Sequence, residues 1–196
     1  MGNQVSDNKN ILKVNNRKEF RKWLSKNHDK EVDCYVELKR GKPVDDKSFY
    51  YIDAVEEALC FGWIDSTVRK VDGVAYQRFS KRRKNSLWTE QNIARVKRLE
   101  ELGLMTDAGR EVLPDNIDEK FVLDKDIKKE LTDAKCLKTF LSFPELYQRI
   151  RVYNINFYKK RNPAAYKKAL DHLIKEASKG KMYGQWDDYG RLIDIV

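Results

Sequence analysis

Residues 63–79 give the sequence its clearest folding signal, because two segments rich in β-forming side chains flank the dipeptide Asp72-Gly73. An Asp-Gly pair in that setting is typical of a type I′ turn, so these residues are expected to form a β-hairpin. Residues 32–38 alternate between apolar and polar side chains, as in a half-buried strand on which Cys34 is most simply a core residue. These segments predict a small antiparallel sheet of about three strands, which is stable only when helices cover one face.

Helical periodicity dominates the rest of the chain. Asn16 is expected to cap a first helix, and Gly62 is expected to end a second helix that begins near Ile52. Ser86 is the expected cap of a third helix, which continues through Leu102. Helices of this kind on one side of a small sheet predict an α+β fold.

A polar stretch divides the chain into two predicted parts. Residues 1–113 are expected to form the α+β domain, 114–125 a linker, and 126–196 a helical C-terminal region. Ser142 and Glu145 have the spacing of a capping box for one of these later helices. Three aromatic residues of the tail are expected to fold back onto the helices: Tyr183, Trp186 and Tyr189.

Charge and cysteine content limit the class of protein. The chain carries 40 Lys and Arg against 31 Asp and Glu, a formal net charge of +9. This balance favours an anionic small molecule or nucleic acid as partner, although a Lys-rich surface also serves solubility alone. Three cysteines without a CxxC pair indicate free thiols in a reducing compartment, and two distant histidines predict neither metal nor cofactor. No segment is apolar enough to span a membrane, so we expect a soluble, cytoplasmic protein whose oligomeric state stays open.

The strongest candidate for a ligand site is the basic segment 77–88, which leads from a strand to a helix start. Arg78, Arg82 and Arg83 could bind an anion bidentately, and the backbone N–H groups after Ser86 would point towards it. A phosphate or a carboxylate is the expected ligand. The alternative is a solvated turn that happens to be rich in Lys and Arg, and charge runs are commonly of that kind.

Two further polar residues are candidates for the same site. Trp63 and Asp65 are two residues apart on a predicted strand and therefore share one face. If that face is covered, Asp65 needs a cationic partner, and Arg78 on the paired strand is the expected one, either to orient it for a ligand or as a structural ion pair. Asn92 falls on an apolar helix stripe, where its amide must bind either the loop backbone or a ligand.

Catalytic chemistry has less support in the sequence. Cys60 could be a nucleophile if nearby arginines lowered its pKa, but a buried thiol on a helix flank is the simpler interpretation. Neither His28 nor His172 is near Cys60 in the sequence. Trp63 and Trp88 could stack a nucleobase or fill the core. No Gly-rich phosphate loop, HExxH or GxSxG motif occurs, so whether the protein is an enzyme stays open.

Four blocks occur in an order and spacing that are specific. They are residues 56–66 (EEALCFGWIDS), 77–88 (QRFSKRRKNSLW), 92–99 (NIARVKRL) and 103–109 (GLMTDAG). In these blocks the chain resembles the YdeI/OmpD-associated (bacteriocin-protection) family, over about its first three-fifths. Lys81 and Asp107 stand where that family usually has Pro, and the C-terminal half matches only loosely.

The resemblance implies a role in bacterial survival under envelope attack, including bacteriocins and cationic antimicrobial peptides, and it brings no established catalytic residues. A protein at +9 should repel cationic peptides, so direct sequestration is not expected. The sequence thus supports three hypotheses. The first is a module that binds an anionic ligand, and the second is an enzyme for a small anionic metabolite that uses Asp65 or Cys60. The third is an interaction protein that uses its helical C-terminal half.

Overall fold

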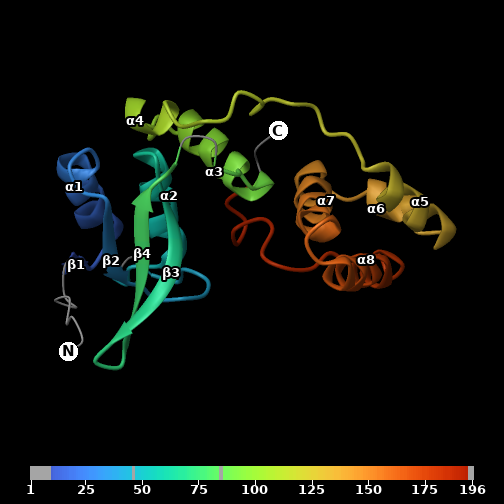
Figure 1. The fold of residues 1–196 in the computed structure, drawn as a ribbon, viewed down its shortest axis with the longest axis horizontal. Coiled ribbons are helices and arrows are strands. Elements are labelled where there is room, and N and C mark those ends of the chain that lie inside the picture. The colour runs from blue at the N-terminus through green and yellow to red at the C-terminus, as the bar shows by residue number, and fades with distance from the viewer. Residues whose placement is uncertain (1–9, 46, 84–85, 194–196) are drawn as a thin grey trace. The chain divides into compact units, whose positions relative to one another are not determined.

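The computed structural model describes residues 10–45, 47–83 and 86–193, and Figure 1 labels its helices and strands. The chain divides into two units. The first unit consists of the residues up to Ser86 together with Val96–Asp115, and the second consists of Leu87–Arg95 together with the chain from Asn116 onward. The polar N-terminal stretch lies outside the described residues.

Among the described residues, the first unit is built on a sheet of four strands in the order β1-β2-β4-β3. The strands are β1 (Ile11–Leu12), β2 (Asp33–Glu37), β3 (Trp63–Val71) and β4 (Val74–Lys81). Together with the helices this confirms the predicted α+β class. β2, β4 and β3 are antiparallel, whereas β1 pairs with β2 in parallel. Two residues are too few to show an alternating pattern, which is why the sequence predicted about three strands.

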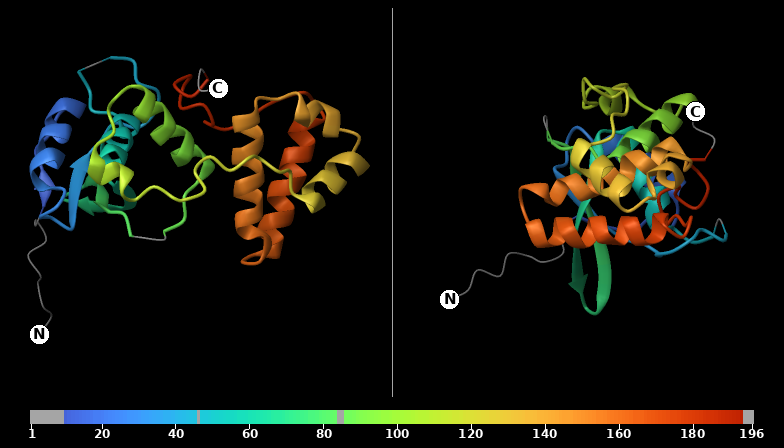
Figure 2. Two further views of the ribbon diagram at one scale, coloured as in Figure 1. Left: turned by 90° about the horizontal axis from the view of Figure 1, so that it is seen from above. Right: turned by 90° about the vertical axis from the view of Figure 1, so that its right-hand side faces the viewer.

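The β3–β4 hairpin turns at Asp72 and Gly73, whose φ angles of 49° and 82° confirm the predicted type I′ turn. Two helices, α1 (Arg17–Asn27) and α2 (Tyr51–Cys60), cover one face of the sheet, and α2 runs along it in Figures 1 and 2. The cap of α1 is Asn16, as predicted, because its side chain accepts a hydrogen bond from a first-turn amide.

The core of this unit lies between the sheet and these helices. Cys34 and Phe79 are fully buried on adjacent strands, and Phe20 of α1 packs on Phe79 with ring centroids 5.3 Å apart. Trp63 is 1% exposed and meets Trp23 edge to face at 5.7 Å. Each buried aromatic removes about 150–250 Å² from water, so this layer holds the first unit together.

Helix α3 (Glu90–Glu101) begins four residues after the predicted cap, Ser86. The hydroxyl of Thr89 instead accepts a hydrogen bond from the amide of Asn92 at 3.2 Å. The prediction of Ser86 as the cap is therefore wrong. The sequence offers two cap-forming residues three positions apart, and the helix uses the one nearer to its apolar stripe. The division between the two units falls within this helix, after Arg95.

Two glycines allow helix α4 (Asp107–Arg110) to approach the end of α2 closely. Gly62 has φ 71° and ends α2 as predicted, and a Cβ there would lie 2.7 Å from the carbonyl oxygen of Ala108. A Cβ on Gly109 would meet the carbonyl oxygen of Cys60. A larger side chain at either glycine would therefore push α4 away from α2.

Buried ion pairs connect three helices of this unit. α2 buries the carboxylates of Glu56 and Glu57. Arg17 and Arg21 of α1 each donate to Glu57 at 2.8 Å, and Arg98 of α3 donates to Glu56 at 3.1 Å. Burying a carboxylate without a cationic partner costs several kcal/mol, so these arginines are needed for the packing of α2.

The second unit is helical, as predicted. Its helices from residue 116 onward, within the described residues, are α5 (Lys125–Asp133), α6 (Leu137–Leu141), α7 (Glu145–Lys159) and α8 (Pro163–Ala177). α7 begins directly after Pro144 without a side-chain cap, so the predicted capping box is wrong. Ser142 instead ends α6 and donates its hydroxyl to the Thr139 carbonyl at 2.7 Å.

The C-terminal tail packs on the helices of this unit through Tyr183 and Trp186, as predicted for these two residues. Trp186 belongs to the buried core, where its ring meets Tyr147 at 5.8 Å, and Tyr183 packs against the same core. Within the described ranges, no helix is both long and apolar enough to cross a membrane.

Candidate functional site

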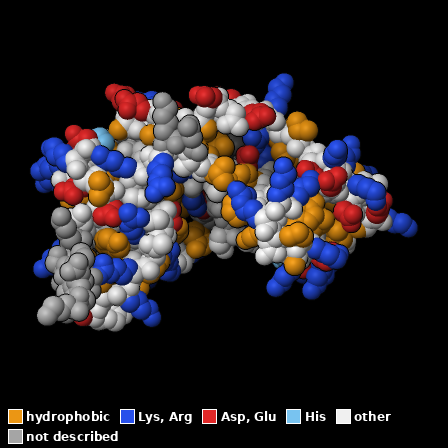
Figure 3. All heavy atoms as spheres, viewed as in Figure 1, with side chains coloured by type: hydrophobic (Ala, Val, Ile, Leu, Met, Phe, Trp, Pro, Cys, Tyr) orange, Lys and Arg blue, Asp and Glu red, His pale blue; other side chains and the backbone are white. Residues whose placement is uncertain are grey.

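Lys and Arg side chains do not by themselves locate a ligand site. In Figure 3 they are spread among Asp and Glu over the visible surface of both units. The position of each predicted site residue on its strand or helix is therefore more informative than the net charge.

Trp63 is a residue of the buried core. It lies at the start of β3, and its indole Nε1 donates to the carbonyl oxygen of His28 at 3.2 Å. Its burial at 1% exposure leaves no surface for stacking a nucleobase. Of the two interpretations given to this residue, the structure supports the core role.

The predicted pair between Asp65 and Arg78 is wrong because β3 contains a bulge. With an uninterrupted register, Asp65 would lie opposite Ser80 and on the same face as Arg78. The register instead shifts by one residue between Asp65 and Val68, and Asp65 lies opposite Phe79. A one-residue shift moves a side chain to the other face of a sheet, so Asp65 and Arg78 point in opposite directions.

The basic turn after β4 is divided between the interior and the surface. Arg82 is only 7% exposed, and its backbone N–H donates to the Gly62 carbonyl at 2.9 Å. Arg83 is exposed. Ser86 is half-buried and lies before α3 rather than at its first turn, so the predicted cradle of N–H groups does not start there. Lys84 and Asn85 of the basic segment lie outside the described residues.

Asn92 belongs to the second unit, whereas the other predicted site residues belong to the first. Its side-chain oxygen accepts a hydrogen bond from Nη1 of Arg95 at 2.7 Å. The amide oxygen on the apolar stripe therefore pairs with an arginine of the same helix, a partner that was not expected from the sequence.

The face of the sheet opposite the helices, called here the outer face, brings together aromatic and cationic side chains that sequence reasoning missed. Tyr35 of β2 lies directly opposite Arg78 of β4, and Tyr76 of β4 lies directly opposite Arg69 of β3. All four side chains are half-buried, and the Arg69 guanidinium carbon lies 5.8 Å from the Tyr35 ring centroid. Ser66, in the bulge, is exposed on this side.

Strand alternation contains a signal for this face. Tyr35 alternates with the core residues Cys34 and Val36, and Tyr76 and Arg78 flank the buried Gln77. Residues on either side of a core position point to the opposite face, so these side chains could have been grouped from the sequence. The bulge could not have been predicted from the sequence, because nothing in residues 65–68 distinguishes it from a regular strand.

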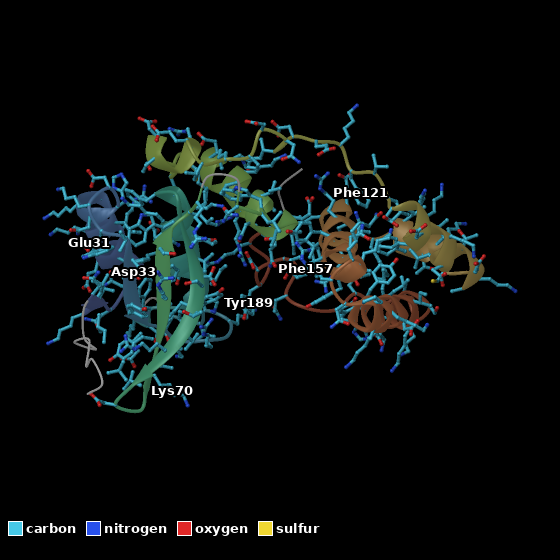
Figure 4. All side chains as sticks on the ribbon, viewed as in Figure 1. Glu31, Asp33, Lys70, Phe121, Phe157 and Tyr189 are labelled. Atoms are coloured by element: carbon cyan, nitrogen blue, oxygen red, sulfur yellow. The ribbon has the colours of Figure 1, made fainter. Side chains whose placement is uncertain are left out.

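Asp33 fixes the orientation of Arg78 on the outer face. Nε and Nη2 of Arg78 both lie 2.8 Å from Oδ2 of Asp33, a residue labelled in Figure 4. Nη1 is directed to the other side, 3.5 Å from the hydroxyl of Ser66. The guanidinium group is thus held along one edge by a carboxylate, and its remaining edge points across the half-exposed surface.

A polar network lies beneath the bulge on the opposite face. Gln77, only 4% exposed, donates through Nε2 to the carbonyl oxygens of Ser66 at 3.1 Å, Thr67 at 3.3 Å and Arg78 at 3.2 Å. Its Oε1 accepts from Arg40 at 2.6 Å. These bonds satisfy carbonyl groups that the bulge leaves out of the strand ladder. They also fix the spacing between the Ser66 and Arg78 backbones.

Asp65 joins this network through α2. Its carboxylate accepts a hydrogen bond from the Tyr51 hydroxyl at 2.6 Å, and the Arg40 guanidinium lies over the Tyr51 ring at 4.1 Å. Asp65 therefore belongs to the support of the bulge rather than to the outer face.

Cys60 has the properties of a core thiol. It is fully buried at the end of α2, and burial raises its pKa to about 11, although Arg21 nearby acts in the opposite direction. A thiol that stays protonated at neutral pH is a poor nucleophile. Among the described residues, no group of three or more His, Cys, Asp or Glu is arranged to hold a metal ion.

Comparison with known proteins gives a family but no activity. Residues 12–112, just over half of the chain, match a family described as Domain of unknown function (DUF8412). The chain belongs to this family. The DUF8412 region includes β2 to β4 and α1 to α4, and with them the whole outer face. No curated protein and no solved structure matches the chain. Membership of DUF8412 names no function, and the resemblance to the YdeI/OmpD-associated family stays a prediction.

Proposed function

We propose that this DUF8412 protein binds a phosphate-bearing ligand on the outer face of its sheet, with Arg78 as the residue that holds the phosphate. The observation that carries the proposal is the geometry of this arginine. Asp33 occupies Nε and Nη2, and Nη1 points across the surface towards the Ser66 hydroxyl. A phosphate oxygen at that edge would accept from both groups.

Preorganisation is what separates this arginine from the many other cations of the surface. Arginine side chains lose about 0.5–1.5 kcal/mol of rotamer freedom when a ligand immobilises them. Asp33 and the Gln77 network beneath the bulge have already restricted Arg78 in the absence of ligand. Arg69, on the same face, adds a second positive charge within the sheet.

The proposal changes the predicted location of the anion site and keeps its chemistry. The basic segment 77–88 contributes Arg78 from β4 and leaves Arg82 largely buried, so the site moves from the turn to the strands. The enzyme hypothesis loses its proposed nucleophile, because the Cys60 thiol is buried with a raised pKa. The net charge of +9 supports attraction of an anion to the molecule as a whole.

Isothermal titration with inorganic tripolyphosphate at low salt tests the proposal. We expect measurable binding that weakens as salt is added, because exposed charges are screened within about 10 Å at 0.1 M salt. Arg78→Gln is expected to weaken binding by about tenfold, since a charge-assisted hydrogen bond is worth about 1.5–3 kcal/mol.

A neighbouring pair of cations supplies a matched control. Arg69 and Lys70 are adjacent in β3 but point to opposite faces, and Figure 4 shows Lys70 near the hairpin tip. Arg69→Gln should weaken tripolyphosphate binding clearly more than Lys70→Gln, although both remove one charge. Equal effects of the two variants, or no binding by the unaltered chain, would contradict the proposal.

A further inference from the structure

We infer that the ligand of the outer face is a single-stranded nucleic acid whose bases stack on Tyr35 and Tyr76. This inference rests on the proposed function, because the phosphates of the strand would use the Arg78 site. It adds the class of ligand, which the chemistry of a phosphate alone does not define.

The two tyrosines are arranged as neighbours on the same face. Tyr35 pairs with Arg78, and Tyr76 pairs with Glu37 two positions along β2. Side chains related in this diagonal way lie about 7–8 Å apart between backbones, within reach of aromatic rings. Both rings are half-buried, so one part of each packs on the sheet and the other part is open to a ligand.

The charges beside the tyrosines determine on which side of the rings the phosphates of a bound strand would lie. Arg69 lies opposite Tyr76 on the β3 side, and Glu37 lies opposite it on the β2 side. A phosphate is attracted to the β3 side and repelled from the β2 side. A strand whose bases cover the two rings would therefore run its backbone along the β3 side of the face, past Arg69 and Ser66 of β3 and Arg78 of the adjacent β4.

Aromatic rings next to arginines favour a single strand over a duplex. Stacking on a side chain requires a base whose face is free, and bases within a duplex already stack on each other. Proteins with small sheets bind single strands by stacking bases on aromatic side chains and pairing phosphates with cations. Stacking on an aromatic ring tolerates any sequence, because every base has a flat π-face.

The two tryptophans considered from the sequence do not compete for this role. Trp63 lies in the core, and Trp88 belongs to the second unit rather than to this sheet. The tyrosines of the outer face are therefore the aromatic groups next to the phosphate site.

Fluorescence anisotropy with a labelled oligothymidylate of about 15 nucleotides, a length within the range of small single-strand sites, tests the inference on the full chain. Tyr76→Leu keeps an apolar β-forming side chain but removes the ring, and Tyr76→Phe keeps the ring. We expect Tyr76→Leu to weaken oligothymidylate binding about fivefold or more while Tyr76→Phe binds like the unaltered chain. Neither variant should change the affinity for inorganic tripolyphosphate, which has no base to stack.

The two proposals fail in different ways. If tripolyphosphate binds and Tyr76→Leu leaves the oligothymidylate affinity unchanged, the stacking inference is wrong and the phosphate site stands. If neither probe binds at low salt, the phosphate site itself is wrong. Photo-crosslinking of a bromodeoxyuridine oligonucleotide to the unaltered chain gives a measurement that needs no variant to fold. Adducts on Tyr35 or Tyr76 support the inference, and adducts confined to other residues overturn it.

Discussion

Arg95 and Asp188 are joined by two hydrogen bonds although 93 residues separate them. Nε of Arg95 lies 2.6 Å from one carboxylate oxygen of Asp188, and Nη2 lies 2.8 Å from the other. Gln91 donates to the same carboxylate at 2.8 Å, and Asn92 accepts from Arg95. The pair is nearly buried, so it fixes the C-terminal tail to the first turns of α3 within the second unit.

Replacing Asp188 by Asn should therefore destabilise the second unit. Breaking a buried ion pair on one side typically costs about 3–5 kcal/mol, because the remaining charge is left without its partner. Asp188 has φ 48°, a conformation that Asn also tolerates, so the loss of stability reports the missing charge rather than backbone strain.

Urea denaturation followed by tryptophan fluorescence measures this loss of stability. Asp171→Asn, in the exposed pair with Lys167, is the control and should leave the midpoint unchanged. If the urea midpoint of Asp188→Asn is also unchanged, the Arg95–Asp188 pair does not stabilise the second unit.

A second buried pair tests the packing of the first unit. Glu57 accepts from both Arg17 and Arg21, so Glu57→Gln should leave two guanidinium groups partly uncompensated. We expect the free energy of unfolding to fall by about 1.5–3 kcal/mol, the range for hydrogen bonds to charged groups, because both guanidinium groups stay about a third exposed to water. Glu100→Gln is the matched control, because Glu100 pairs with Arg110 at the surface and should not affect the melting temperature. Equal melting temperatures for both variants would show that the buried pairs are not needed for the fold.

Local sequence signals predicted most of the first unit. The Asp72-Gly73 turn, the cap at Asn16 and the glycine that ends α2 each act through neighbouring residues, and each is found where expected. The alternation in residues 32–38 also assigned Cys34 to the core. Such features depend on backbone conformation and on short-range hydrogen bonds, which the sequence specifies directly.

Features that depend on distant residues were not predictable in the same way. The bulge in β3 is stabilised by Gln77 from the partner strand, and it reverses the face on which Asp65 lies. Arg78 consequently pairs with Asp33, a residue 45 positions away. A shift of one residue exchanges every cross-strand partner beyond it, so the predicted site residues were divided between two faces.

The thiol groups predict how stability changes with pH. Burial raises the pKa of Cys60 to about 11 and also raises the pKa of Cys34. A thiol whose pKa is higher in the folded state stabilises the fold fully below the unfolded value of about 8.5, and this contribution is lost as the pH rises towards the folded value.

Urea denaturation between about pH 8.5 and pH 11 measures this loss, which approaches about 1.4 kcal/mol per pH unit for one thiol. Cys60→Ala should show a shallower decline over this range, even though the variant starts from a lower stability. A decline as steep as that of the unaltered chain would show that Cys60 ionises in the folded state. Rapid labelling of Cys60 by a thiol reagent at neutral pH would lead to the same conclusion.

Gln77 should affect binding as well as stability. Gln77→Leu has a similar volume but leaves the carbonyl groups of Ser66 and Thr67 without their donor, at a cost of about 1–3 kcal/mol. We expect the same variant to weaken tripolyphosphate binding, because the spacing between Ser66 and Arg78 is no longer fixed. Tyr51→Phe, which removes the hydroxyl that donates to Asp65, should lower stability with a smaller effect on affinity. Unchanged affinity for Gln77→Leu would mean that the bulge does not position the site.

Asp33 provides the sharpest distinction between a positioned arginine and general attraction of anions. Asp33→Ala removes a negative charge from the outer face, so attraction alone predicts tighter binding of tripolyphosphate. A site that depends on the orientation of Arg78 predicts weaker binding, by roughly 2- to 10-fold, because the ligand must then immobilise the guanidinium group itself. Glu31→Ala removes the same charge two residues away without touching Arg78, and it should leave binding unchanged or slightly tighter. Weaker binding for Asp33→Ala alone, measured by titration calorimetry, is the expected result, and tighter binding for both variants would contradict it.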